Sequence, residues 1–169
     1  ADGVEFLWNG DPAYWSGRAP HLFPFVGSLR GGRASCSQGE VVLPQHGLAR
    51  KTPYETESVD GMSVTYRLSS TAETRKGYPY DFIFRVRHSL DGRALTTTYI
   101  VENTGEVLPA EELPHLFDSF YRGSNAGSQE GSGLGLYICR KLMHKMNGDV
   151  FLKQEENLFS VTVVVGMAN

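Results

Sequence analysis

Three glycines in the C-terminal third of the chain have a spacing that could hold phosphate. Gly131, Gly133 and Gly135 alternate with Ser132 and Leu134, and residues without side chains let backbone N–H groups approach a phosphate closely. An amphipathic helix is predicted to begin near Leu134, and its positive N-terminus would face the same ligand. A lone GxGxG is weak evidence by itself. The alternative is a flexible Gly/Ser loop that leads into the helix.

The segments around this loop predict the helices and strands that would position it. The predicted helix carries apolar residues on one face and basic residues near its C-terminal end, namely Leu134, Tyr137, Ile138, Leu142 and Met146, and Arg140, Lys141, His144 and Lys145. Asn147-Gly148 is a natural stop. A shorter helix is predicted from Pro109 onward, because a proline and two acids suit a first helical turn. Strands over residues 150–152 and 158–165 would close the chain.

The first hundred residues predict antiparallel strands separated by turns. Apolar and polar residues alternate over residues 62–68, 82–87 and 95–101, which is the period of a half-buried strand. Asp91-Gly92 lies between the last two and signals a tight hairpin turn. Such strands, with no long helix between Gly3 and Leu95, predict an antiparallel β-sandwich-like part. The fold class expected for the whole chain is α+β, with its two parts packed directly together.

The composition excludes several classes of protein. The chain has 169 residues, 40% of them apolar, and a formal net charge of −3, so it lacks the basic surface that nucleic-acid or membrane binding requires. No apolar run approaches the ~18 residues of a membrane span, and no signal-peptide pattern opens the chain. Cys36 and Cys139 have no framework spacing, so we expect two free thiols, a cytoplasmic protein and no metal site.

Five strings in the first part occur in an order that resembles a known family. They are residues 5–8 (EFLW), 11–15 (DPAYW), 22–27 (LFPFVG), 43–50 (LPQHGLAR) and 78–82 (YPYDF). Together, over residues 1–105, they resemble the N-terminal part of the aldose 1-epimerase (galactose mutarotase-like) family. The resemblance implies a sugar-binding cleft in which His46 is the candidate catalytic residue and sugar contact, with Arg50, Arg30 and Tyr78 as further contacts.

The chemistry of that family requires more than His46. Opening a hemiacetal ring needs an acid at the ring oxygen and a base at the anomeric hydroxyl, and imidazole suits such work because its pKa lies near neutrality. The family's principal acid, in an HPxF-type string, and its base, a distant Glu, have no counterpart in this sequence. Ser28 stands where family members often carry an Arg, and Arg30 lies two residues on. The alternative for His46 is a hydrogen-bonded loop residue, and Trp8 and Trp15 are expected in the core.

A second resemblance begins near residue 106. Residues 111–123 (EELPHLFDSFYRG) and 131–138 (GSGLGLYI) resemble the F box and G2 box of the sensor histidine kinase ATP-binding domain. The resemblance assigns the loop glycines to the phosphates, Arg122 to the γ-phosphate and Asn103 to the adenine amino group. The helix that supplies a Mg²⁺-binding Asn has no counterpart. ATP with Mg²⁺ is therefore expected to bind weakly, and no other cofactor is expected.

Both active sites are incomplete, so the sequence predicts a hybrid without catalytic activity. Residues 1–105 would be a mutarotase-like β fragment and residues 106–169 a histidine kinase-like α/β fragment, and residues 99–105 fit both families as a strand running into a turn. The alternatives are a sugar-binding protein related to aldose 1-epimerases, an isomerase if active, and an ATP-binding module, a phosphotransferase if active. The expected partners are a hexose, ATP, and a second copy paired through exposed sheet edges.

Overall fold

The chain folds as two compact units in a computed structural model. The structure describes residues 8–36, 38–92, 94–103, 107–126, 132–156 and 158–166. The first unit comprises residues 1–53 and 76–79, and the second comprises residues 54–75 and 80–169. Each unit therefore contains a stretch of chain that is interrupted by the other.

The first unit has little regular structure. A 3-10 turn, η1 (Arg30–Gly32), precedes the strands β1 (Ala34–Cys36) and β2 (Gly39–Val41), which pair antiparallel. An isolated parallel bridge joins Phe23 to Gly47. Its buried apolar residues are few: Phe23, Val41, Leu48 and Ala49. Backbone hydrogen bonds between loops add to this small core.

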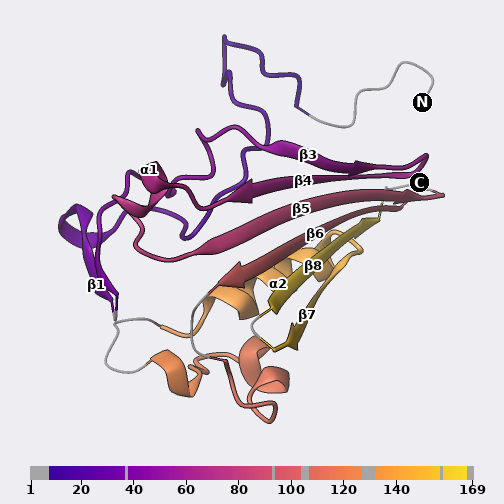
Figure 1. Cartoon of the computed structure of the whole chain (residues 1–169). Coiled ribbons are helices and arrows are strands. Elements are labelled where there is room, and N and C mark those ends of the chain that lie inside the picture. The colour runs from indigo at the N-terminus through magenta and orange to yellow at the C-terminus, as the bar shows by residue number, and fades with distance from the viewer. Residues whose placement is uncertain are drawn as a thin grey trace. The chain divides into compact units, whose positions relative to one another are not determined.

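The second unit is an antiparallel six-stranded sheet with the order β3-β4-β5-β6-β8-β7 (Figure 1). Its strands are β3 (Glu55–Val59), β4 (Ser63–Ser69), β5 (Phe82–Asp91), β6 (Ala94–Asn103), β7 (Asp149–Glu155) and β8 (Leu158–Gly166). A short helix, α1 (Ala72–Arg75), lies between β4 and β5. Between β6 and β7 come η2 (Leu113–Phe117), η3 (Ser124–Ala126) and α2 (Gly135–Lys145), and α2 contacts β7 and β8. The sheet thus combines strands from both sides of residue 105.

Register places the apolar residues of these strands on one face of the sheet. Val86 is fully buried and Phe84 nearly so. The Phe84 ring stacks on the ring of Tyr99 with centroids 6.0 Å apart, and the Tyr54 ring tilts against it at 6.3 Å. Burial, followed by the electrostatic effect of Tyr99, raises the pKa of Tyr54 to about 12. Two cross-strand rows form this face. One row consists of Phe84, Val101 and Phe159, and the other of Val86, Tyr99 and Val161.

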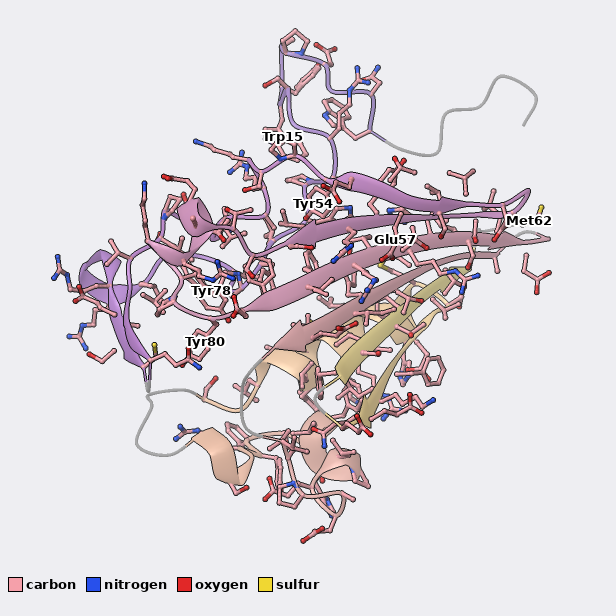
Figure 2. The ribbon with its side chains drawn as sticks, viewed as in Figure 1. Trp15, Tyr54, Glu57, Met62, Tyr78 and Tyr80 are labelled. Carbon is pink, nitrogen blue, oxygen red and sulfur yellow. The ribbon has the colours of Figure 1, made fainter. Side chains whose placement is uncertain are left out.

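The opposite face carries an ion-pair network centred on Arg85. Its Nε donates to both carboxylate oxygens of Glu57 at 2.8 and 3.0 Å, and a terminal nitrogen donates to Glu102. Glu57 is labelled in Figure 2. Burial opposes the charge of Arg85, but the hydrogen bonds to Glu57 and Glu102 outweigh it, so the pKa of Arg85 lies above its ordinary value. The network joins β3, β5 and β6 across the polar face.

Most of the predicted elements are present. The strands predicted over residues 62–68, 82–87 and 95–101 correspond to β4, β5 and β6, and the hairpin turn contains Gly92 with a φ of +56°. In the described part of residues 3–95 the longest α-helix is the four-residue α1. Helix α2 ends just before Asn147, which adopts a φ of +55°. The strands from Ala34 to Asn103 lie in two sheets, and their arrangement as a sandwich stays a prediction.

The helix predicted from Pro109 is shorter than expected. It is the five-residue 3-10 helix η2, with a proline in its first positions, and residues 110–112 form a turn instead. Pro114 has no backbone N–H to donate within a helix, so a helix can contain it only near its start. This places the start at Leu113 and explains the lost turn.

Both cysteines are free thiols, as predicted. Among the residues that the structure describes, no helix is both long and apolar enough to cross a membrane. β3 and β7 are the two edges of the sheet, and the pairing of two copies through an edge stays a prediction.

The pairing of β6 with β8 can be tested by cross-linking. Thr98 pairs with Thr162, so cysteines at these two positions are expected to form a disulfide under mild oxidation, counted as lost free thiols in a Cys36→Ser, Cys139→Ser background. The control pair, Thr96→Cys with Ser160→Cys, is four positions out of register, about 13 Å apart along the strands. Such a pair is too distant to bridge. Equal cross-linking of both pairs would contradict the register.

Candidate functional sites

In the first unit, the strings around Phe23 and His46 are docked onto each other. The carbonyl of Phe23 accepts hydrogen bonds from the N–H groups of Leu48 at 2.9 Å and Ala49 at 3.3 Å, and the His46 N–H donates to the Gly27 carbonyl at 2.7 Å. Gly47 has a φ of +74°, and a Cβ there would lie 2.2 Å from the Phe23 oxygen. Glycine alone fits this approach, so the two strings together fix the position of His46.

The backbone also fixes the tautomer of the His46 ring. The Gly27 N–H donates to Nδ1 of His46 at 3.0 Å, so Nδ1 is the acceptor and Nε2 carries the hydrogen. The residue is half-buried and has a φ of +71°, a conformation uncommon outside glycine. His46 is thus a hydrogen-bonded loop residue, as the alternative interpretation expected. Its Nε2–H is the donor that remains for a ligand.

The other three predicted sugar contacts belong to the same unit. Tyr78 is half-buried, and its ring stands edge-on to Phe23 with centroids 5.9 Å apart. Arg50 is the exposed last residue of the His46 string, and Arg30 is exposed in η1. Phe23 therefore links Tyr78 to the His46 string, whereas the two arginines project from exposed turns. Their contact with sugar stays a prediction.

The prediction that Trp8 and Trp15 lie in the core is wrong. Their exposed fractions are 44% and 46%, and that of Tyr14 is 83%. Trp8 donates its indole N–H to the Trp15 carbonyl at 2.7 Å, and its ring stands edge-on to Tyr14. A turn begun by Asp11 holds this loop, since its carbonyl accepts the N–H groups of Tyr14 and Trp15. The Trp8 indole satisfies its N–H within this loop, and composition alone does not reveal that.

In the second unit, the glycine loop and the segment before it are also docked together. The Phe120 N–H donates to the Gly133 carbonyl at 3.1 Å. Gly133 has a φ of +65°, and a Cβ there would lie 2.5 Å from the carbonyl oxygen of Tyr121. The glycine therefore serves the packing of two backbone segments. The phosphate contact that its motif predicted stays a prediction.

Two of the remaining predicted nucleotide contacts, Gly135 and Arg122, lie wholly in the described part of the chain. Gly135 is the first residue of α2, and a Cβ there would meet no atom within 4 Å. The residue before it, Leu134, provides no side-chain cap, Gly135 is exposed, and the first N–H groups of a helix have no partner within the helix itself. Arg122 is exposed. Gly131 and the side chain of Asn103 lie outside the described residues.

A carboxylate orders the segment between η2 and η3. Glu112 accepts a hydrogen bond from the Ser124 N–H at 2.8 Å. Hydrogen bonds from the side chain and backbone of Ser124 hold the pKa of Glu112 below its ordinary value. His115 contacts the Asp118 carboxylate at 2.9 Å and the Tyr121 ring at 5.6 Å between centroids. The F-box-like string is therefore a locally bonded loop.

A pocket of about 190 Å³ on the side of α2 was not predicted from the sequence. It is lined by two aromatic and three basic residues: Phe117, Tyr137, Arg140, Lys141 and His144. The sequence did contain a signal, because Tyr137 and Lys141, and likewise Arg140 and His144, are four residues apart and share one side of a helix. Phe117 comes from η2, so the pocket requires the packing of η2 on α2.

Two family models match the chain, and the matches overlap. The model of aldose 1-epimerase matches residues 1–111. The model of histidine kinase-, DNA gyrase B- and HSP90-like ATPase matches residues 60–167. The shared residues, 60–111, contain β4, β5 and β6. The two resemblances seen in the sequence are confirmed.

Individual relatives divide in the same way. The plasmid protein LacX of Lactococcus lactis subsp. lactis is 39% identical over 107 residues, 60% of this chain and 36% of that protein. The sensor histidine kinase GlrK of Escherichia coli K12 is 39% identical over 72 residues, 41% of this chain and 15% of that protein. A galactose mutarotase related enzyme from Lactobacillus acidophilus, solved by X-ray crystallography, has a TM-score of 0.57 and 36% identity over 62% of this chain and 35% of its own. The chain therefore spans about a third of its mutarotase-like relatives.

The two loop glycines are expected to respond differently to alanine. Gly133→Ala places a Cβ against the Tyr121 carbonyl at positive φ, so the free energy of unfolding should fall by about 1–3 kcal/mol. Gly135→Ala is the matched control, because its Cβ meets open space in a helix, and it should leave stability unchanged or raise it by up to about 1 kcal/mol. Urea denaturation measures both. Equal destabilisation would show that Gly133 has no special packing role.

Proposed function

Since the chain belongs to the aldose 1-epimerase family over residues 1–111 and to the histidine kinase-, DNA gyrase B- and HSP90-like ATPase family over residues 60–167, we propose that it is a hybrid that binds a hexose through its first part and catalyses neither family's reaction. The seam lies near residue 105, after β6. Residues 1–105 descend from the mutarotase-like family, and residues 106–169 from the kinase-like one.

The orientation of His46 carries the proposal of sugar binding. The Gly27 N–H occupies Nδ1, so Nε2–H is presented as a donor of fixed tautomer. Sugar hydroxyl and ring oxygens are acceptors for such a donor. One neutral hydrogen bond contributes about 0.5–1.5 kcal/mol, and exposed arginines add little until a ligand orders them. The affinity for a hexose should therefore be no tighter than millimolar, which corresponds to about −4 kcal/mol.

Catalysis needs two proton-transfer groups, and this chain supplies at most one. A mutarotase protonates the ring oxygen while a base removes the anomeric hydroxyl proton, and each group contributes about 10²–10⁴-fold. With Nδ1 accepting from the backbone, the His46 ring is neutral, and its Nε2–H can donate a hydrogen bond but is not an acid that transfers a proton to the ring oxygen. The acid and base strings of the family have no counterpart in the sequence. Sugar binding without mutarotation is the consistent outcome.

An NMR titration and a polarimetric assay test the two parts of this proposal. Galactose or glucose is expected to shift the His46 ring signals and the Gly27 amide with a millimolar midpoint, while the mutarotation of fresh α-galactose proceeds at the buffer rate. His46→Asn, which tolerates positive φ, should abolish the shifts, and His115→Gln, an exposed histidine of the other unit, should not. Absence of shifts up to saturating sugar would refute sugar binding. A faster mutarotation that His46→Asn abolishes would refute inactivity.

A weak ATP site is the second candidate, favoured by the open N-terminus of α2 at Gly135. Free N–H groups there and the helix dipole attract phosphate. The packing of Gly133 against residues 120–121 argues against a nucleotide site, because it leaves this glycine less accessible to a phosphate. Phosphate contacts without a bound base should give an affinity of about a millimolar or weaker.

Calorimetry with a non-hydrolysable ATP analogue and Mg²⁺ is expected to detect no micromolar binding. Gly135→Val is the informative variant, since its side chain enters open space and would obstruct a phosphate without disturbing the fold. Gly61→Val, between β3 and β4 with open space around it and no positive φ, controls for a general effect of the substitution. A micromolar constant that Gly135→Val alone abolishes would show that a nucleotide site has been rebuilt.

A further inference from the structure

We propose that the pocket on the side of α2 binds the phosphate group of a small phosphate monoester. The pocket is formed by Phe117, Tyr137, Arg140, Lys141 and His144 and has a volume of about 190 Å³. This is below the range of about 300–1,000 Å³ for pockets that enclose a whole drug-sized ligand. It suits a compact headgroup whose remainder extends toward solvent.

One carboxylate, that of Asp149, faces the three basic residues of the pocket among the described residues. Arg140 Nε and His144 Nε2 both contact one oxygen of Asp149, at 3.2 and 2.9 Å. Among the described residues, Lys141 has no carboxylate partner; its ammonium lies 5.5 Å from the centre of the Tyr137 ring. The terminal nitrogens of Arg140 are not used by Asp149. A dianionic phosphate would therefore meet an ammonium and a guanidinium fork, the groups that bind it most strongly in proteins.

The aromatic residues restrict water and add selectivity. The Arg140 guanidinium lies 4.8 Å from the centre of the Phe117 ring. The ring therefore orients the guanidinium and covers one of its faces. A guanidinium that lies over a ring can still donate hydrogen bonds from the N–H groups at its edge. An ester with an aromatic substituent could also contact the edge of Phe117. A carboxylate of the same size carries half the charge and fewer acceptor oxygens.

This pocket is separate from the glycine loop. Arg140 and Lys141, the groups proposed to hold the phosphate, lie five and six residues after Gly135 in α2, which is roughly 8–9 Å along the helix axis. A phosphate held between their side chains lies away from the backbone N–H groups at the start of the helix. Binding here is therefore independent of the nucleotide site considered above, and the two can be separated by mutation.

An NMR titration of the whole chain at constant ionic strength tests the proposal with inorganic phosphate, phenyl phosphate and acetate. Both phosphates are expected to shift the His144 ring and the side chains of Arg140 and Lys141 with saturation in the millimolar range. Phenyl phosphate should bind several-fold tighter than inorganic phosphate, and Phe117→Leu should remove that difference. Acetate should bind at least about tenfold more weakly, in line with the larger charge of phosphate.

Two charge-matched variants decide whether the pocket is specific. Lys141→Gln should weaken phosphate binding about tenfold, the loss of one charge-assisted hydrogen bond. Lys153→Gln, on β7 beside Glu155, should leave it unchanged. Equal weakening by both variants, equal affinity for acetate, no saturation up to about 50 mM phosphate, or loss of binding in Gly135→Val would each overturn the proposal. Far-UV circular dichroism confirms that each variant is folded.

Discussion

The second unit depends on the pairing of β6 with β8. β6 is the last strand that both family models match, and β8 belongs to the kinase-like segment. Side chains alternate along a strand, so a slip of one residue would move every apolar side chain of β8 to the polar face. The observed register instead sets Val161 beside Tyr99 and continues the apolar face that Phe84 begins on β5. Two unrelated segments can share this sheet because their alternation is in phase where they meet.

A second constraint recurs in both units: the glycines of each motif are used first for packing. Gly47 approaches the Phe23 carbonyl and Gly133 approaches the Tyr121 carbonyl, each at positive φ. In each case a glycine lets two strings that are distant in sequence dock through their backbones. A ligand can use only what this docking leaves exposed. In the first unit that is Nε2 of His46, and in the second it is the N-terminus of α2 at Gly135.

Local patterns predicted the elements well, because alternation and turn residues act over a few positions. β4, β5, the Gly92 turn and the end of α2 at Asn147 followed from such signals. The pairing of β6 with β8 did not follow from such signals, because β8 lies about sixty residues further along the chain and strand pairing is non-local.

The environment of a predicted face also depends on tertiary partners. Ile138, Leu142 and Met146 form the apolar stripe of α2, yet each is about half exposed. Met143, on a neighbouring side of the helix, packs toward Gly148 instead. Hydrophobic periodicity identifies a stripe but does not choose what covers it. The docking of His46 on Gly27 was hidden for the same reason, because the donor is a backbone N–H with no sequence signature.

Asp149 separates the structural from the functional explanation of the basic residues on α2. Its carboxylate accepts from the N–H of Val150 and contacts His144 and Arg140, and these interactions, the backbone hydrogen bond first, hold the pKa of Asp149 below its ordinary value. This arrangement fastens the last turns of the helix to the start of β7, and basic groups near a helix C-terminus are favourable in any case. Stability therefore accounts for Arg140 and His144 without a ligand. It does not account for Lys141, whose ammonium faces the Tyr137 ring and has no carboxylate partner in the described part of the chain. Lys141 is the residue through which binding and stability can be told apart.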